Sequence, residues 1–188
     1  MKSQEKQETK TIFKAIFAWE DEKEEKWLEE MAAKGWKLEN VVPYFYTFRR
    51  STPEKMIYRL DYKYTLDKDY QEYLTLFKDA GWELLASFAN WHYFRISPQN
   101  ERVPEIYNSD KAKAQKYRRL LLGLTPLLPL YIFIFNPATG VLSPDHTSRV
   151  SIFYSCLQVF MVVFLIFFIY AMVKVFIKIK KLESPHKE

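Results

Sequence analysis

Apolar and polar residues follow different patterns in the two parts of the chain. Between residues 11 and 98, short stretches of β-branched and aromatic residues alternate with segments in which apolar residues recur every three or four positions. Such a mixture is typical of strands and helices in a folded domain. Between residues 119 and 177, two long apolar runs flank a polar loop. The pattern predicts a folded domain followed by a membrane part.

The folded part contains an internal repeat with an offset of about 46 residues. The segment WLEEMAAKGWKLEN aligns with YLTLFKDAGWELLA, and FYTFRRS aligns with WHYFRIS. Gly35 and Gly81 take the same place in the two copies, where a residue in the left-handed conformation ends a helix. Each copy is predicted to form a β-α-β-β unit, the first over residues 11–51 and the second over residues 56–97.

The fold class expected from this repeat is α+β. The two units are predicted to pair their strands into one antiparallel sheet that both helices cover on one face. Trp36 and Trp82 are expected to pack against the sheet rather than to line a ligand site, because a Trp just after a helix end is usually buried in this way. The other face of the sheet is predicted to stay open.

Aromatic side chains on the open face are the predicted binding surface for a ligand, a partner domain or the membrane surface. Simple exposure of single aromatic residues is an equal alternative. The predicted binding residues are Phe45, Trp91, Tyr93, Arg49 and Arg95. The acidic stretch over residues 20–30 is interpreted as a solvated helix face, with docking of a basic partner as its alternative.

The apolar runs predict a two-helix transmembrane hairpin over residues 119–177. The second run, residues 151–173, has no charged residue and is long enough to cross a hydrocarbon core of about 30 Å. The first run, residues 120–135, is shorter and contains Pro126 and Pro129, which should kink a helix. A re-entrant first segment is the alternative.

Basic residues beside the apolar runs predict the orientation in the membrane. By the positive-inside rule, the polar tail over residues 1–10, the folded domain, the basic linker over residues 99–118 and the tail over residues 178–188 lie in the cytoplasm. Nucleic acid is not an expected partner, because the surplus behind the net charge of +5 lies mostly beside the membrane part. The residues expected at the lipid headgroups are Lys116, Arg118, Arg119, Lys174 and Lys178.

The residue types needed for catalysis or metal binding are scarce. Cys156 is the only cysteine, and the histidines, His92, His146 and His186, fall in a strand, the loop and the tail. The sequence has no phosphate-binding glycine loop, no nucleophile elbow and no Cys/His pair suited to nucleophilic catalysis. We therefore expect no enzymatic activity, metal site or cofactor.

Two segments carry a resemblance to a known family. KGWKLENVVPYFYTFRR and AGWELLASFANWHYFRI, with the apolar runs behind them, resemble the bacterial domain-of-unknown-function family numbered 2812 over nearly the whole chain. That resemblance implies a membrane protein often encoded near PadR-type transcriptional regulators, with no established activity. The doubled β-α-β-β order is also similar to GyrI-like effector-binding domains, which hold drug-like molecules, although no matching pocket carboxylate is found.

Two functions are compatible with these patterns. The first is a membrane-tethered, non-catalytic sensor or adaptor whose cytoplasmic domain binds a transcription regulator or a small amphipathic ligand. The alternative is an accessory subunit of a transporter or another membrane assembly, whose hairpin packs against a membrane protein or a second copy of the chain. Small and polar residues favour close helix approach in lipid. The packing face would then include Ser155, Cys156 and Gln158.

Overall fold

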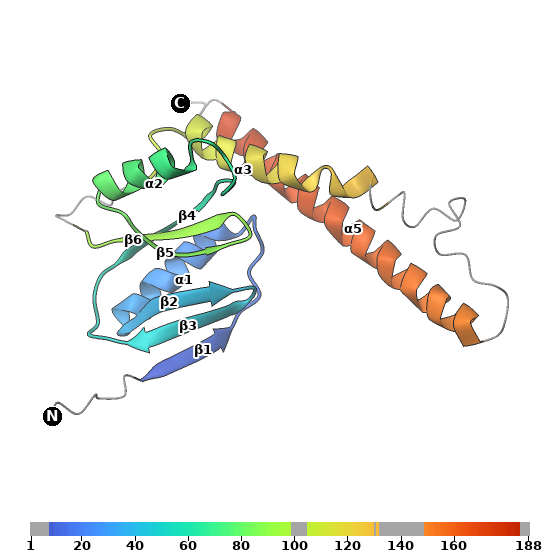
Figure 1. Cartoon of the computed structure of the whole chain (residues 1–188), viewed down its shortest axis with the longest axis horizontal. Coiled ribbons are helices and arrows are strands. Elements are labelled where there is room, and N and C mark those ends of the chain that lie inside the picture. The colour runs from blue at the N-terminus through green and yellow to red at the C-terminus, as the bar shows by residue number, and fades with distance from the viewer. Residues whose placement is uncertain (1–7, 99–104, 130, 132–148, 185–188) are drawn as a thin grey trace. The chain divides into compact units, whose positions relative to one another are not determined.

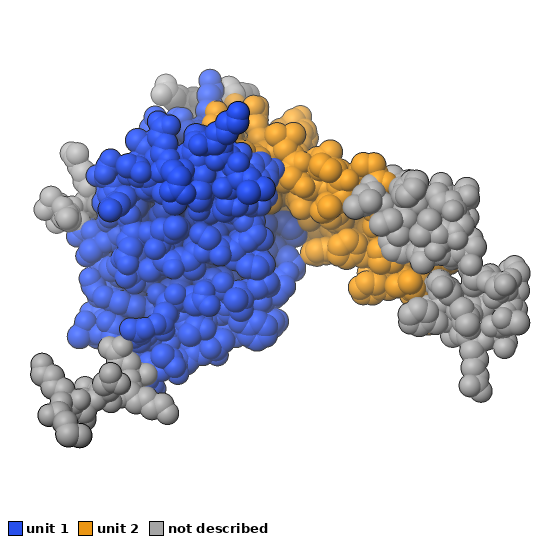
Figure 2. All heavy atoms as spheres, in the orientation of Figure 1, with its two compact units in different colours: residues 1–112 blue, residues 113–188 orange. Residues whose placement is uncertain are grey.

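A computed structural model describes residues 8–98, 105–129, 131 and 149–184. The chain divides into two compact units, residues 1–112 and residues 113–188 (Figure 2). The polar loop predicted between the apolar runs, with His146, lies outside the described residues apart from Arg149, and His186 in the tail lies outside them too.

The first unit contains the order β-α-β-β twice, as the repeat predicts (Figure 1). The first strand ends at Phe13. The elements are β1 (Thr9–Phe13), α1 (Asp21–Ala33), β2 (Trp36–Val42), β3 (Phe45–Arg50), β4 (Ile57–Tyr62), α2 (Tyr70–Asp79), β5 (Glu83–Phe88) and β6 (Trp91–Ile96).

The two hairpins keep the same register. Leu38 pairs with Phe48 in the first hairpin, and the residues 46 positions later pair in the second, where Leu84 faces Phe94. Both hairpins have a bulge directly after the leucine. The glycine after each helix has a positive φ, as expected for a left-handed helix end. The repeat seen in the sequence is therefore also a repeat of backbone structure.

The prediction of one sheet with both helices on the same face is wrong. The strands form two three-stranded antiparallel sheets, β1-β3-β2 (sheet A) and β4-β6-β5 (sheet B). Figure 1 shows α1 between the two sheets and α2 on the other face of sheet B. Sheet B therefore has a helix on each face. In agreement with this, five of the six residues of β4 are buried, on both sides of the strand.

Two clusters of apolar residues hold these layers together. The larger cluster contains Leu28 of α1 and draws residues from both sheets, among them Phe48 and Leu60. The smaller cluster, in which Trp82 is buried as predicted, lies under α2. Trp36 is partly buried against the larger cluster. The two units of the repeat thus share one core around α1.

The second unit holds most of α3 (Asp110–Leu124) and all of α5 (Arg149–Glu183). The helix of the first apolar run ends at Leu124 in a turn over residues 125–126, which agrees with the predicted effect of Pro126. Among the described residues, one helical stretch, Cys156–Glu183, is long and apolar enough to cross a membrane. Length and composition therefore support one membrane span, in α5. The other predicted span, in the first apolar run, extends beyond the described residues.

Candidate functional site

Four exposed apolar side chains gather at one end of sheet A. Phe13, Val42, Tyr44 and Phe45 are each between 45% and 63% exposed. Phe13 faces Phe45 across the strands, with ring centroids 5.2 Å apart, and its ring lies 6.3 Å from that of Tyr44. These four residues form a continuous surface, which we call the aromatic patch.

The backbone presents Tyr44 to solvent at a conformational cost. Its φ is 63°, in the left-handed region that bulky residues rarely adopt. The Tyr44 carbonyl accepts a hydrogen bond from the Lys14 N–H at 2.8 Å, which fixes the turn against the end of β1. In the second copy of the repeat, the equivalent turn holds Ala89 and Asn90, and Asn tolerates this conformation well. An aromatic side chain thus stands where the turn favours Gly or Asn, a form of strain that often marks functional positions.

Three of the predicted binding residues lie at surfaces but do not come together. Phe45 belongs to the aromatic patch, as expected for an open face. Arg49 lies on the same strand and forms an ion pair with Glu39. Arg95 lies on sheet B, where its guanidinium bonds both carboxylate oxygens of Glu83 at 2.8 and 2.9 Å. Each arginine is paired within its own hairpin.

The other two predicted binding residues face inward. Trp91 is half-buried and packs edge-on against Tyr62, with ring centroids 5.5 Å apart. Tyr93 is only 6% exposed and belongs to the core around α1, so its predicted place on an open face is wrong. The reason is that α1 covers this face of sheet B, so the open sheet face belongs to sheet A, which the first copy of the repeat forms.

A buried carboxylate explains how Tyr93 is accommodated in the core. Its hydroxyl donates a hydrogen bond to Glu24 Oε1 at 2.7 Å, and Tyr46 donates to the same oxygen at 2.8 Å. Burial raises the pKa of Glu24, although both hydroxyl bonds and Lys14 act in the opposite direction. Burial and the Glu24 charge together raise the pKa of both tyrosines. Glu24 therefore joins α1 to both sheets.

The burial of these acids corrects the interpretation of residues 20–30 as a solvated helix face. Asp21, Glu24 and Glu25 are at most 9% exposed. The helical spacing of the acids could have indicated an inward-facing set, because Asp21, Glu24, Glu25 and Leu28 recur at the three- and four-residue intervals of one helix face. The buried face of α1 thus contains both carboxylates and apolar side chains.

A second buried carboxylate, Asp61, lies in β4. Its oxygens accept hydrogen bonds from the Tyr73 hydroxyl at 2.9 Å, from the Tyr62 N–H at 2.7 Å and from the Tyr107 hydroxyl. Burial and the charge of Asp61 raise the pKa of Tyr107. Asp61 therefore connects β4 to α2 and to the segment that follows sheet B.

His92 has a structural place in the same region. Its Nε2 lies 2.9 Å from the Lys63 carbonyl oxygen, which can only accept, so Nε2 carries the proton and donates. Its Nδ1 then accepts from the Ser87 hydroxyl at 2.8 Å. Burial lowers the pKa of His92, which keeps the ring neutral. Both ring nitrogens are thus engaged within the fold.

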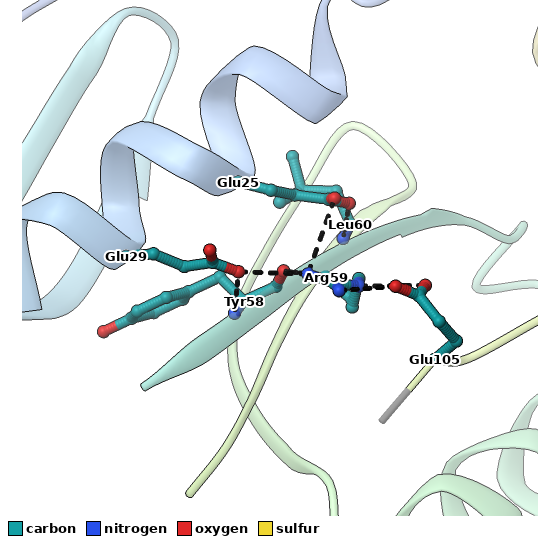
Figure 3. Close-up of polar contacts among 6 residues, drawn as sticks. All are labelled: Glu25, Glu29, Tyr58, Arg59, Leu60 and Glu105. Carbon is teal, nitrogen blue, oxygen red and sulfur yellow. Dashed lines mark hydrogen bonds and ion pairs between the residues drawn. The ribbon is translucent and has the colours of Figure 1, made fainter. Parts of the chain in front are cut away.

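Two glutamates of α1 cover the outer edge of sheet B (Figure 3). β4 is an edge strand, so its outward N–H groups have no strand partner. Glu25 accepts the Leu60 N–H at 2.8 Å, and Glu29 accepts the Tyr58 N–H at 3.3 Å. The four-residue spacing of the glutamates on a helix thereby matches the two-residue spacing of the amides on a strand.

Arg59 lies between these glutamates and a third carboxylate. Its guanidinium is 3.0 Å from Glu29 and 3.9 Å from Glu25, and it bonds both oxygens of Glu105 at 3.1 and 2.6 Å (Figure 3). Burial alone would lower the pKa of Arg59, but the carboxylates outweigh it and raise the pKa. The sequence reasoning did not single out this group, because its members are far apart in the chain.

The predicted membrane-interface residues lie in the middle of α3 and within the last ten residues of α5. Arg118 forms an ion pair with Glu183 at 2.6 Å, which joins the two helices. The ammonium groups of Lys116 and Lys178 lie 5.0 and 4.7 Å from the centre of the Tyr117 ring. The Lys116 side chain is buried, that of Arg119 is partly buried and that of Lys174 is exposed.

Residues after the turn at Pro126 lie beside α5. An apolar recess is formed by side chains from both segments, and the Tyr131 hydroxyl donates a hydrogen bond to the Met161 carbonyl. The residues that line the recess are Leu127, Leu128, Tyr131, Phe164, Leu165 and Phe168. The two apolar runs thus pack against each other where both are described.

The aromatic patch and the buried carboxylates differ in how far they are already engaged within the fold. Within residues 8–98, 105–129, 131 and 149–184, no group of three or more His, Cys, Asp and Glu side chains could hold a metal ion. The carboxylates described above are engaged by tyrosines, backbone amides or arginine. By contrast, the aromatic patch offers a large apolar surface to solvent.

Comparison with known proteins gives one match. The sequence profile of a family described as "Protein of unknown function (DUF2812)" matches residues 20–128, which is more than half of the chain. No curated protein and no solved structure matches.

Proposed function

The chain belongs to the DUF2812 family, and we propose that it is a membrane-anchored, non-catalytic sensor or adaptor. Its N-terminal domain lies in the cytoplasm and binds a regulatory protein or a small amphipathic ligand through the aromatic patch. The observation that carries this proposal is the exposure of Phe13, Tyr44 and Phe45 side by side on a domain whose other described aromatic residues, except Phe88, are buried or partly buried.

The nature of the patch supports binding rather than incidental exposure. Single exposed apolar residues are common on protein surfaces, whereas contiguous patches often mark interaction sites. Aromatic residues are also over-represented in interfaces, because they bury a large area and lose little conformational entropy. The strained turn at Tyr44 adds a second, independent feature at the same place.

Anchoring in the membrane by two spans is part of the proposal. α5 contains 35 residues and exposes many apolar side chains, including Val159, Phe160 and Ile166. The segment from Leu127 to Tyr131 runs beside it, as the first arm of a hairpin would. The basic residues of α3, before the first apolar run, and those in the last ten residues of α5 favour a cytoplasmic location for both termini.

Site-specific photocrosslinking tests the binding surface. A benzophenone amino acid is placed at Tyr44 of the full-length protein in bacterial cells, and the control position is Leu76 of α2, which is 63% exposed. We expect a discrete adduct at position 44 and none at position 76, with mass spectrometry identifying the bound protein or small molecule. Equal labelling at both positions, or no adduct at position 44, would contradict the proposal.

Thiol labelling tests the orientation. Leu66 is 96% exposed, so Leu66→Cys in a Cys156→Ser background provides one accessible thiol. A membrane-impermeant maleimide should label it only after the cells are broken, and the protein should stay with the membranes after alkaline extraction. Labelling in intact cells would place the domain outside the cytoplasm.

The alternative function, an accessory subunit of a membrane assembly, has one observation in its favour. Gln158 is an exposed polar side chain on the apolar helix α5, and such a residue in lipid tends to find a partner across a helix interface. If α5 packs against a membrane partner, Gln158→Leu should weaken that contact, measured as crosslinking between α5 and the partner. Under the sensor proposal, the same substitution leaves the adduct at position 44 unchanged.

A further inference from the structure

The short segment that precedes α3 is attached to sheet B at three successive residues. Glu105 forms a two-oxygen ion pair with Arg59, and the Tyr107 hydroxyl bonds Asp61. Between them, Ile106 packs against the apolar cluster under α2. Since α3 begins at Asp110, these contacts fix the entrance to the helix that leads toward the membrane part.

The same arginine is also attached to α1. One terminal nitrogen of Arg59 bonds Glu29, while the other terminal nitrogen and Nε bond Glu105 (Figure 3). The guanidinium therefore joins two carboxylates from segments 76 positions apart. A displacement of Glu29 changes the position of the guanidinium and, with it, the geometry of the bonds to Glu105, because the guanidinium is rigid and planar.

The contacts at this position suit release better than permanent attachment. Glu105 is 55% exposed, so water can replace Arg59 as its partner at little cost. The contacts described above come from three consecutive residues, and short attachments of this kind open locally without unfolding of the whole domain. Arg59, in contrast, is only 12% exposed and keeps its contacts to α1 when Glu105 leaves.

We propose that residues 105–107 form a releasable strap, and that Arg59 couples the strap to α1. In the closed state the strap is held on sheet B, just before α3 begins. When α1 shifts, the bonds between Arg59 and Glu105 weaken and the strap opens, so that α3 is no longer restrained by the N-terminal domain. The strap transmits a change in the domain to the membrane part by this route, whatever binds the aromatic patch.

Limited proteolysis of the full-length protein in detergent micelles measures opening of the strap. Chymotrypsin cleaves after aromatic residues, and cleavage after Tyr107 requires the strap to leave sheet B. At low protease concentration, the cleavage rate follows the population of the open state. Cleavage after Phe94, which is buried in β6, reports on unfolding of the whole domain in the same sample.

Three substitutions separate the parts of the proposal. Glu105→Gln removes the charge that Arg59 binds, and we expect cleavage after Tyr107 to rise about tenfold. Glu29→Gln keeps the acceptor for the Tyr58 N–H but weakens the bond to Arg59, and it should raise the same cleavage about threefold through α1. Glu30→Gln changes an exposed residue of the same helix and should leave the rate unchanged.

The outcome with Glu29→Gln decides whether the coupling exists. An unchanged rate in this variant would overturn the proposal even if Glu105→Gln opens the strap. A rise in cleavage after Phe94 that parallels the rise after Tyr107 would also overturn it, because the whole domain would then be unfolding. Faster cleavage after Tyr107 alone, in both variants, is the result that the proposal requires.

Discussion

The two β-α-β-β units share a backbone plan but differ in how their helices are used. Phe13 and Tyr62 are equivalent, because each pairs with the first residue of its unit's last strand. Phe13 and Tyr62 are 49 positions apart, whereas the hairpins that follow them are offset by 46 positions. The three extra residues lie in the first copy, where α1 has 13 residues and α2 has 10. The difference between the units is thus confined to the helix, which is almost one turn shorter in the second copy.

The longer helix is the one that became the centre of the domain. α1 buries six residues between two sheets, whereas α2 covers one face of sheet B and buries none completely. Duplicated sequences therefore need not keep equivalent environments. The first copy supplies the helix of the shared core and the open sheet face, and the second supplies the central sheet. Four predictions test this asymmetry, and they are ordered here from the largest expected effect.

Equivalent leucines should differ most. Leu28 of α1 is fully buried and Leu74 of α2 is partly buried. Leu28→Ala should lower the free energy of unfolding by about 4 kcal/mol and Leu74→Ala by about 1.5 kcal/mol, because the cost follows the cavity that is left. Urea unfolding of the full-length protein in micelles, monitored by tryptophan fluorescence, measures both. Similar losses would mean that α2 contributes to the core as much as α1.

The two helix-ending glycines should also respond unequally to Ala. Both have a positive φ, which alone costs about 1 kcal/mol for Ala. A Cβ at Gly35 would lie 2.6 Å from the Ser51 carbonyl oxygen, whereas at Gly81 the nearest atom is the flexible Ile96 Cδ1 at 3.3 Å. We expect losses of about 3 kcal/mol for Gly35→Ala and about 1 kcal/mol for Gly81→Ala. Thermal or urea unfolding would show equal losses if the backbone near Ser51 adjusts freely.

The buried carboxylate of α1 should make stability depend on pH. The pKa of Glu24 is raised in the folded state, so the folded protein keeps a proton that the unfolded chain has lost. The resulting stability is fully present below the unfolded pKa and is lost as the pH rises through the folded pKa. Glu24→Gln keeps an oxygen acceptor for both tyrosines and removes this loss.

Relative to wild type, Glu24→Gln should therefore gain stability as the pH is raised from 4.5 to 7.5. Urea unfolding curves of both proteins across this range provide the measurement, with Glu30→Gln as the exposed control on the same helix. A difference that stays constant, or that shrinks as the pH rises, would show that the tyrosine hydrogen bonds outweigh burial of the charge.

The smallest effect is expected at Tyr58. Its side chain is fully buried beside α1, and within the described part of the chain its hydroxyl has no hydrogen-bond partner. Tyr58→Phe removes an unsatisfied polar group without a change of shape, so stability should stay within about 0.5 kcal/mol of wild type or rise slightly. A loss of more than about 1.5 kcal/mol in the same unfolding assay would indicate that a water molecule or another group bonds the hydroxyl.

Local features of the sequence predicted the elements well but not their assembly. The glycines at helix ends and the alternating aromatic runs predicted the order β-α-β-β in both copies of the repeat. The relation between the sheets was missed, because periodicity shows which faces are apolar and not which element covers them. One indication was present in IYRLDY of β4, where apolar residues on both sides of the strand are typical of a sheet covered on both faces.

The aromatic patch was predicted only in part. Phe45 was selected because it lies in an aromatic strand, but Phe13 and Tyr44 were not. Their contribution depends on the antiparallel pairing of β1 with β3 and on a turn conformation that Tyr seldom adopts. Cross-strand pairs of this kind become visible only when register is known.

Glu25 and Glu29 of α1 also affect whether neighbouring molecules can aggregate when the protein is concentrated. An uncovered sheet edge can pair with a strand from a neighbouring molecule and start an intermolecular sheet that grows into an aggregate. At Tyr58 and Leu60, the amides that such a strand would need already donate to carboxylates. Two neighbouring molecules therefore cannot join along β4 unless both glutamates withdraw, which hinders polymerisation through this edge at high protein concentration.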